Sequence, residues 1–578
     1  MNQKIPFVAT AMAAALILAT RFTHKHPVAE SVNAYKTKNI ISCSPDWAAI
    51  KDWLEETDIP PIPGSGTHIW KINTKNDSAQ FYFNQGINIY YSFHIIEAMA
   101  SFKKAARFDP ECAMLYWAQA LTYGPNINDY GYAASPEALD ATQKALQFSS
   151  TANEIEKGLI NSISVRYTVD SADTNREMLN KAYTAKMKEL YEKYPDNADV
   201  QALYADAMML EHPWDLWYVD GRPKEWTPHI REVLEKLLSK YPNHPGANHY
   251  YIHVMEPSPY AYKALPSADL LGKLTPGLSH TVHMPSHIYL RTGNYARGVS
   301  VNEDAVNSYK RALALFAPVS GNEFIYVMHN LHMQTNHAMM LGQSDYSDKS
   351  AEKTRKSVPE DYLNLEAPVG SYMQYLYMTP VMSDVRFGKW ESLLAMEKPK
   401  ETWPYANVLY YFGRGFAFTK KGNLQAASKE LDAMREFMKD PALSVPMSPF
   451  SPVLEGARVA EQLLLGVIHE EKKMNDGAIR HYALADSIEK NMVYTEPRDW
   501  MLNPKHFLGN AYLSASKWKE AENIFRADLN YNNENGWALY GLYKTLQGQK
   551  KNAEAEKVLA KFNKASSKAD IQIGSPVY

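Results

Sequence analysis

Residues 81–110, FYFNQGINIYYSFHIIEAMASFKKAARFDP, decide the fold. Gly86 is a small residue that lets a second helix approach closely, and Ala98 and Phe102 share one face of that second helix because they are four residues apart. Pro110 then ends the helix, since proline lacks the backbone N–H that a helix interior requires. The period-2 alternation of a strand is absent. The stretch therefore predicts two short antiparallel helices joined by a turn.

The same pattern returns three times in the C-terminal half. Gly541 lies 32 residues beyond Gly509, a spacing typical of tetratricopeptide (TPR) repeats, in which each unit is a pair of helices. The copies in register are Gly415, Ala427 and Leu431; Leu508, Gly509, Tyr512, Ala521 and Phe525; and Trp537, Gly541, Ala553 and Ala560. Weaker helix pairs are indicated at 177–211, 228–256, 285–312 and 452–490. We therefore predict an all-α, TPR-like helical-repeat solenoid of about eight or nine helix pairs.

Four parts are expected along the chain. Residues 1–29 are predicted to be a signal peptide or N-terminal anchor, and residues 30–78, rich in proline, glycine and polar residues, an irregular segment. Residues 79–440 form the N-terminal TPR-like array with a histidine-rich centre. Four prolines at 441–452 mark a break, so residues 441–578 are expected to form a C-terminal set of TPR-like repeats.

The first residues indicate export. Lys4 precedes an apolar run from Phe7 to Thr20, and Arg21 follows it, which is the order of charged and apolar regions in a secretory signal. As a helix the run spans roughly 21 Å, short of the ~30 Å hydrocarbon core of a membrane. We expect an exported protein that is periplasmic, or anchored to the inner membrane and facing the periplasm.

Composition and motifs exclude several classes of function. The 578 residues carry a net charge of -3 without a basic stripe, so no nucleic-acid partner is expected, and a membrane partner only through the N-terminal anchor. The sequence contains no glycine-rich phosphate loop, G-x-S-x-G or H-E-x-x-H, so no nucleotide cofactor is expected. Because Cys43 and Cys112 are the only cysteines, a thiolate metal site is excluded as well.

Histidine is concentrated in one region, since nine of the 18 histidines lie between His244 and His337. His249, His253 and Glu256 are predicted on one helix, where offsets of four and seven residues place them on one face. Two imidazoles and a carboxylate on one face are a ligand set for a divalent metal.

Two further histidine groups follow this helix. His280 and His283 are expected in a loop, and His287 in the helix that this loop precedes. His329 and His332 lie on a third segment. Because stacked repeats place equivalent helices about 9–10 Å apart, their inner faces can converge on one pocket. The predicted metal ligands are His249, His253, Glu256, His280, His283, His287, His329 and His332.

Two interpretations of these histidines are open. Imidazole ligands favour zinc, copper or iron over calcium or magnesium, and an open position for water or oxygen would make the site catalytic. The alternative is a buried polar network, since an imidazole in a helix often only hydrogen-bonds a neighbour. Packing alone does not explain three clusters, because burying imidazoles costs free energy unless each has a partner.

A polar and aromatic insertion, Glu496-Pro497-Arg498-Asp499-Trp500, separates two C-terminal repeats. It either lines a ligand groove or forms a plain loop between repeats. The loops at 124–136 and 254–280 are also longer than a repeat needs, and long loops in a regular array are commonly functional.

Five motifs of the chain are FNQG at 83–86, YGPN at 123–126, HPGANHYYIH at 244–253, HMPSHI at 283–288 and NGW at 535–537. In these motifs the chain resembles a family of largely uncharacterised bacterial TPR proteins. The His-Met-Pro-Ser-His-Ile motif is the most specific of the five. The resemblance implies the helical-repeat fold and a shared histidine-bearing centre, and it implies no particular activity.

Two functions remain open from the sequence. In the first, an exported TPR scaffold holds a His/Glu divalent-metal site with a catalytic or metal-handling role. In the second, the concave groove of the array binds a peptide or partner protein outside the cytoplasm, without metal or catalysis.

Overall fold

The computed structural model is helical, and the residues it describes contain no strand beyond one isolated bridge between Trp217 and Pro223. The predicted signal segment at 1–29 and the start of the 30–78 segment lie outside the described part of the chain. Within that part, no helix combines the length and apolar character needed to cross a membrane. The all-α prediction is confirmed. The described residues are 45–129, 132, 135–170, 173–319, 323–497 and 499–578.

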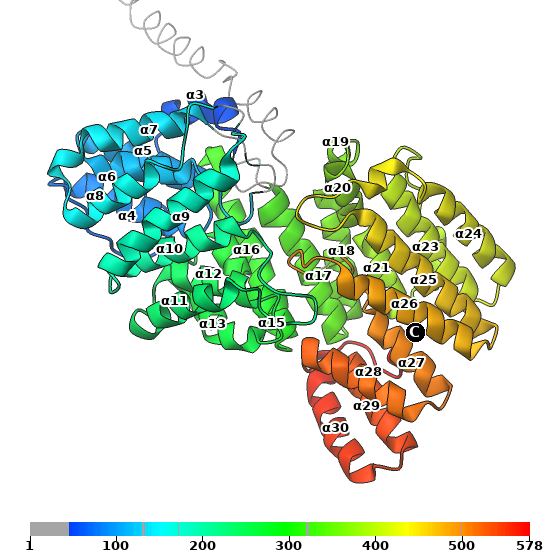
Figure 1. Ribbon diagram of the computed structural model, residues 1–578. Coiled ribbons are helices and arrows are strands. Elements are labelled where there is room, and N and C mark those ends of the chain that lie inside the picture. The colour runs from blue at the N-terminus through cyan, green and yellow to red at the C-terminus, as the bar shows by residue number, and fades with distance from the viewer. Residues whose placement is uncertain (1–44, 130–131, 133–134, 171–172, 320–322, 498) are drawn as a thin grey trace, which may run out of the picture.

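Helices follow one another with short connections, and they pack mainly against their neighbours in the sequence (Figure 1). The first half contains α3 (Trp47–Glu56), α4 (Asp77–Tyr90), α5 (Ile95–Phe108), α6 (Ala113–Thr122), α7 (Pro136–Gln147), α8 (Glu154–Ile163), α9 (Arg176–Lys193), α10 (Ala198–Glu211), α11 (Thr227–Lys240), α12 (Pro245–Met255), α13 (Leu265–Leu274), α14 (Ser279–His283), α15 (Pro285–Arg291) and α16 (Tyr295–Leu315). After a π-helical turn (Phe324–His329) come α17 (Asn330–Leu341), α18 (Ser344–Ser357), α19 (Glu360–Leu363), α20 (Val369–Tyr377), α21 (Thr379–Phe387), α22 (Trp390–Ala395), α23 (Pro404–Lys420), α24 (Leu424–Phe437), α25 (Val453–Glu471), α26 (Asn475–Asn491), α27 (Pro504–Ser514), α28 (Trp518–Tyr531), α29 (Gly536–Gly548) and α30 (Asn552–Ala565).

The repeated small and aromatic residues of the sequence are contacts between paired helices. Between α4 and α5, the ring of Phe102 lies on Gly86, where an added Cβ would be 2.5 Å from Phe102 Cε1. Between α27 and α28, a Cβ at Gly509 would be 2.5 Å from Phe525 Cζ. In both pairs the missing side chain makes room for the aromatic ring of the partner helix. The TPR-like helical-repeat fold is thereby confirmed.

Replacing Gly86 with alanine is expected to lower the free energy of unfolding by about 1–2 kcal/mol. Overpacking a core typically costs about 1–3 kcal/mol, and the better helix propensity of alanine offsets up to about 1 kcal/mol of this cost. Denaturant titration measures the difference. Gly574→Ala is the matched control, because a Cβ at Gly574 meets no atom within 4 Å. An unchanged midpoint for Gly86→Ala would show that α4 and α5 do not pack through this glycine.

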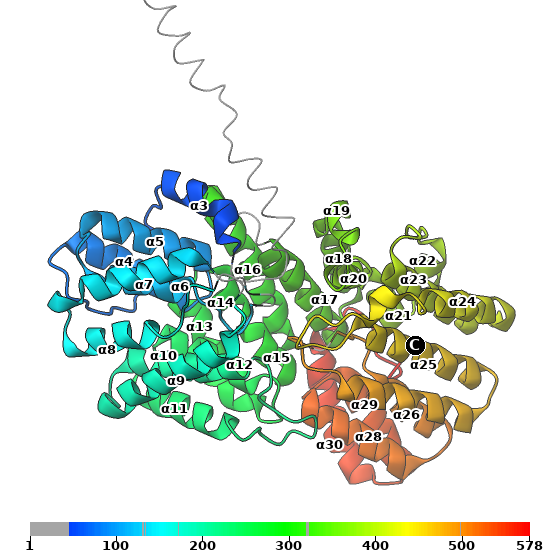
Figure 2. The same cartoon turned by 45° about the horizontal axis from the view of Figure 1, so that its top comes forward.

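The end of the chain returns to its middle. One large hydrophobic cluster extends from α3 to α16, and a second extends from α19 to α27 and includes Met339 of α17. In the ribbon, α17 lies between the two halves of the chain (Figures 1 and 2). Trp537 Nε1 of α29 donates to Met339 O of α17 at 2.9 Å. The Arg291 guanidinium of α15 lies 3.5 Å from the centre of the Tyr531 ring of α28. These contacts bring C-terminal segments beside α15 and α17, which carry His287, His332 and His337.

Candidate metal centre

The first histidine group is His249, His253 and His280. His249 and His253 lie on α12 and Glu256 follows at its end; all three are fully buried and face one another, as their spacing predicts. His253 Nε2 lies 3.0 Å from His249 Nε2, and His253 Nδ1 lies 3.1 Å from Glu256 Oε1. His280 comes from α14, and one nitrogen from each of the three rings lies within 4.8 Å of the others.

The second histidine group is His283, His287 and His329. The expectation that His280 and His283 lie in a loop is wrong, because both belong to α14 and Met284 keeps helical dihedral angles (φ -48°, ψ -37°). The proline that follows occupies the first position of α15, where its missing N–H is not needed, so the helical path continues. His283 Nε2 is therefore only 2.8 Å from His287 Nε2, and His329 Nε2 is 3.1 Å from His283 Nε2.

His329 and His332 have separate environments although they are three residues apart. His329 ends the π-helical turn that leads into α17, and such turns are frequent at functional sites. His332 Nδ1 lies 3.0 Å from Thr379 Oγ1, and its ring packs against that of Tyr375. His332 is therefore the one predicted metal ligand that lies apart from the others.

Hydrogen bonds around the second group fix which ring nitrogens carry hydrogen. Asn302 Nδ2 donates to Gly298 O at 2.8 Å, so Asn302 Oδ1 is the atom that faces His283 Nδ1 at 2.5 Å. His283 Nδ1 therefore carries a hydrogen. His283 Nε2 consequently directs its lone pair toward His287 Nε2, 2.8 Å away. His287 Nδ1 lies 3.3 Å from Glu256 Oε2 without forming a hydrogen bond to it.

Burial keeps the second group uncharged. It lowers the pKa of His283 to about 4. It also holds the pKa values of His287 and His329 well below the usual range, and the neighbouring imidazoles add to this effect. At pH 7 these rings are therefore neutral. Neutral imidazoles whose lone pairs converge repel one another unless a cation lies between them.

Two carboxylates lie beside the histidines. Glu256 faces both groups, with Oε1 3.1 Å from His253 Nδ1 and Oε2 3.3 Å from His287 Nδ1. Tyr494 OH donates to Glu256 Oε2 at 2.8 Å, and Glu496 Oε1 lies 3.1 Å from His253 Nδ1. Burial and the nearby Glu496 raise the pKa of Glu256. Burial alone would lower the pKa of His253, but the two carboxylates raise it to about 9.

Two further segments complete the site, and sequence reasoning connected neither of them with the histidines. Tyr494 and Glu496 come from the loop between α26 and α27, and nothing in the 496–500 insertion points to a histidine far earlier in the chain. Phe93, in the turn between α4 and α5, has φ 56°, which is rare for a bulky residue, and its ring lies 4.4 Å from that of His249. Strained residues of this kind cluster at functional sites, but a backbone angle leaves no signal in the sequence.

A third cluster, His68, Asp199 and His244, is a hydrogen-bond network. His244 Nδ1 accepts a hydrogen bond from Ala247 N at 3.1 Å, so His244 Nε2 carries the hydrogen and donates to Asp199 Oδ1 at 3.2 Å. His68 Nε2 and Tyr91 OH each lie 2.8 Å from the same oxygen. Although burial opposes it, these donors hold the pKa of Asp199 well below its ordinary value. His244 thus offers a metal no lone pair on the side facing Asp199.

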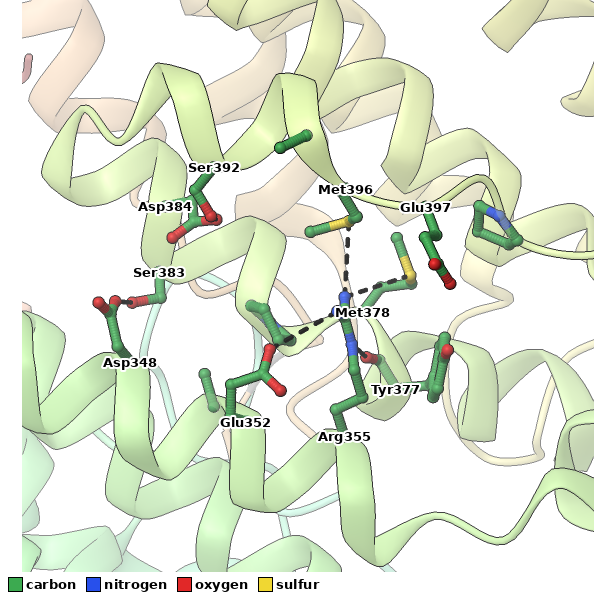
Figure 3. Close-up of a pocket in the computed structure, with 14 residues that line it drawn as sticks. Asp348, Glu352, Arg355, Tyr377, Met378, Ser383, Asp384, Ser392, Met396 and Glu397 are labelled. Atoms are coloured by element: carbon green, nitrogen blue, oxygen red, sulfur yellow. Dashed lines mark hydrogen bonds and ion pairs between the residues drawn. The ribbon is translucent and has the colours of Figure 1, made fainter.

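A cavity of about 480 Å³ lies apart from the histidines, among α18, α21 and α22 (Figure 3). Its one arginine, Arg355, is already engaged: its Nε donates to Tyr377 O at 3.0 Å, and its Nη2 lies 3.5 Å from Met396 Sδ. The other charged residues of the wall are acidic, so the cavity suits a positively charged group, although Glu352 lies 3.6 Å from Arg355 Nη1 and Asp348 pairs with Lys389. The acidic residues are Asp348, Glu352, Asp384 and Glu397.

A second cavity, of about 450 Å³, lies where α15, α17 and α28 meet. Arg291 and Pro497 form part of its wall. Arg291 Nη1 donates to Glu256 O, and Pro497 follows Glu496 in the chain. This cavity therefore adjoins the carboxylates that face the histidine groups.

Comparison with known proteins gives no family for this chain. No protein-family model matches the chain, and no curated protein matches it. Among solved structures, human IFIT1 in its dimer with m7Gppp-AAAA is 10% identical over 90% of this chain and 100% of its own, with a TM-score of 0.30. Yeast Tom70 is 14% identical over 84% and 96%, with a TM-score of 0.31. At such scores the likeness carries no functional argument, so the TPR-like assignment rests on the packed helix pairs of this chain.

Proposed function

We propose that the chain is a TPR-like scaffold that binds a divalent transition metal through His283, His287 and His329. The observation that carries the proposal is the 2.8 Å contact between the Nε2 atoms of His283 and His287. Asn302 Oδ1 accepts from His283 Nδ1, and Glu256 Oε2 lies 3.3 Å from His287 Nδ1. Histidines that ligate metals are held in this way by an acceptor at their second nitrogen.

The ligand set defines the chemistry that the site supports. Three imidazoles suit zinc, copper or iron, and they leave at least one coordination position open, as catalytic sites require. A Lewis-acid role toward water, oxygen or a substrate oxygen is the reaction type that such an ion supports.

Elemental analysis of the full chain, purified without chelator, tests the proposal. We expect at least about one transition-metal ion per chain, because a three-histidine site of this kind is pre-organised. The double variant His283→Ala/His287→Ala should lose the ion bound by this group. His332→Ala is the matched control, since His332 is a buried histidine as well, but it lies on α17 and faces Thr379. Wild-type protein with metal well below one per chain would refute the proposal.

Peptide or protein binding is the second candidate function, and the acidic cavity of Figure 3 favours it. Burial raises the pKa of Asp384 to about 6, so this carboxylate is charged at pH 7 and can receive a lysine or arginine side chain of a partner. An array of basic peptides tests the idea, with Glu352→Gln/Asp384→Asn as the variant and the exposed Asp432→Asn as control. If no peptide is retained, or if the double variant retains them equally, this candidate function is wrong.

We also propose that the chain is exported, on the basis of the apolar run between Lys4 and Arg21. Leu16→Arg interrupts this run and is expected to leave the full chain in the cytoplasm of a Gram-negative host, whereas Leu16→Ile should not. Cell fractionation measures the distribution. Equal periplasmic amounts of both variants would mean that the run is not an export signal.

A further inference from the structure

We propose that His249, His253 and His280 hold a second divalent transition-metal ion, which makes the histidine centre binuclear. The inference rests on the metal-binding function proposed above and extends it to a separate set of ligands. Each of the two groups supplies three imidazoles, and no histidine belongs to both. Two separate ions are therefore required to use all six rings.

The environment of His249 and His253 fixes their tautomers. His249 Nδ1 lies 2.7 Å from Tyr91 O, and a carbonyl oxygen can only accept, so this nitrogen carries hydrogen. His253 Nδ1 lies 3.1 Å from both Glu256 Oε1 and Glu496 Oε1, so it carries hydrogen as well. Both rings consequently direct Nε2 inward, and these two nitrogens are 3.0 Å apart.

A single proton shared by His249 and His253 would relieve the repulsion between their Nε2 atoms without any metal. His280 distinguishes this alternative from metal binding. Its side chain is buried, with 4% of the residue exposed, and both of its ring nitrogens lack a hydrogen-bond partner. A shared proton leaves His280 unsatisfied, at the cost of a buried polar group without a partner. A metal ion takes one lone pair from each of the three rings.

His280 is held in place by groups that do not compete for its ring nitrogens. Its backbone N–H donates to His94 Nε2 at 3.3 Å, and His94 Nδ1 in turn lies 2.9 Å from Glu97 Oε1. The Phe93 ring stacks on the His280 ring at 5.7 Å between centroids. The ring is thus oriented by its backbone and by stacking, while its nitrogens stay available to a ligand.

The two groups are adjacent and share an anion. His280 and His283 are three residues apart on α14, and their ring centroids are separated by 6.4 Å. Glu256 lies between the groups, with one carboxylate oxygen toward His253 and the other toward His287. Two divalent ions bring four positive charges into a buried site, and Glu256 together with Glu496 supplies the negative charge that such burial requires.

Metal titration of the full chain tests the inference. The metal-free protein is incubated with excess Zn²⁺, passed through a desalting column and analysed for zinc, and the absorption of bound Co²⁺ is recorded in parallel. Wild-type protein is expected to retain two ions per chain. His249→Ala/His280→Ala and His283→Ala/His287→Ala should each retain one, and His332→Ala should retain two. Because all ligands are imidazoles, excess Mg²⁺ or Ca²⁺ should not displace the zinc.

The outcomes separate the inference from the proposed function. A wild-type value of one, with none left in His283→Ala/His287→Ala, overturns the second site and leaves the first intact. A wild-type value of zero overturns both. If His249→Ala/His280→Ala retains two ions, the first group is not a site. Circular dichroism establishes whether each variant is folded. If His249→Ala/His280→Ala does not fold, the number of ions bound by the wild-type chain, two or one, still decides whether a second site exists.

Discussion

Replacing Asp528 with alanine is expected to lower the free energy of unfolding by about 3–5 kcal/mol, because several buried donors lose their acceptor and each such loss costs about 1–3 kcal/mol. Asp528 is fully buried on α28, and His506 Nε2 lies 2.9 Å from its Oδ2. The amides of Asn532 and Asn535 donate to the same carboxylate at 2.8 and 2.9 Å. Without the carboxylate these donors remain buried with no acceptor. Urea unfolding measures the loss, and Asp432→Ala, at an exposed position on α24, is the control.

The same carboxylate gives the prediction a pH signature. Burial alone would raise the pKa of Asp528, but His506 and the amide donors lower it from 3.8 to about 2. A carboxyl group whose pKa is lowered on folding contributes about 2 kcal/mol to the free energy of unfolding for a shift of this size. This contribution is fully present above pH 3.8 and is lost as the pH falls toward 2. The difference between wild type and Asp528→Ala should therefore shrink between pH 4 and pH 2. A difference that stays constant over this range would exclude the charge of Asp528 as its source.

The parts of the site that the sequence predicts are those set by local geometry. Gly86 and Phe102 are in contact because the two helices of one repeat pack together, and the spacing of small and aromatic residues along the sequence predicts this contact. His249, His253 and Glu256 meet because residues four and seven apart share a helix face. Each of these contacts spans one helix or one helix pair, so the periodicity of the chain is sufficient to predict it.

The parts that the sequence does not predict depend on contacts between distant segments. His329 joins His283 across 46 residues, and Tyr494 reaches Glu256 across 238. The contact between Tyr494 and Glu256 forms because C-terminal segments pack beside α15 and α17. The repeat pattern in the sequence does not predict that the chain folds back in this way. The sequence predicts that a helix begins near Pro285, but it does not predict α14, because a proline makes a helix that continues through it doubtful.

Replacing Glu256 with glutamine is expected to weaken metal binding at both histidine groups by roughly 10–100-fold each, the usual effect of removing an acceptor that orients a ligating imidazole. Glu256 Oε1 lies 3.1 Å from His253 Nδ1, with which it forms a hydrogen bond, and Oε2 lies 3.3 Å from His287 Nδ1. A glutamine keeps one oxygen but turns an NH₂ group toward one of the two imidazoles, where donor faces donor. It also removes the negative charge nearest to both ions.

Competition titration with a zinc chelator measures both affinities of Glu256→Gln against wild type. The control is Glu303→Gln on α16, where the exposed carboxylate accepts a hydrogen bond from Tyr346 OH at 3.1 Å. Because the carboxylate is shared, both dissociation constants should rise together in Glu256→Gln and neither in Glu303→Gln. A change confined to the site of His283 and His287 would mean that Glu256 serves one ion only. Unchanged affinities at both sites would mean that the carboxylate balances charge in the fold and does not orient the metal ligands.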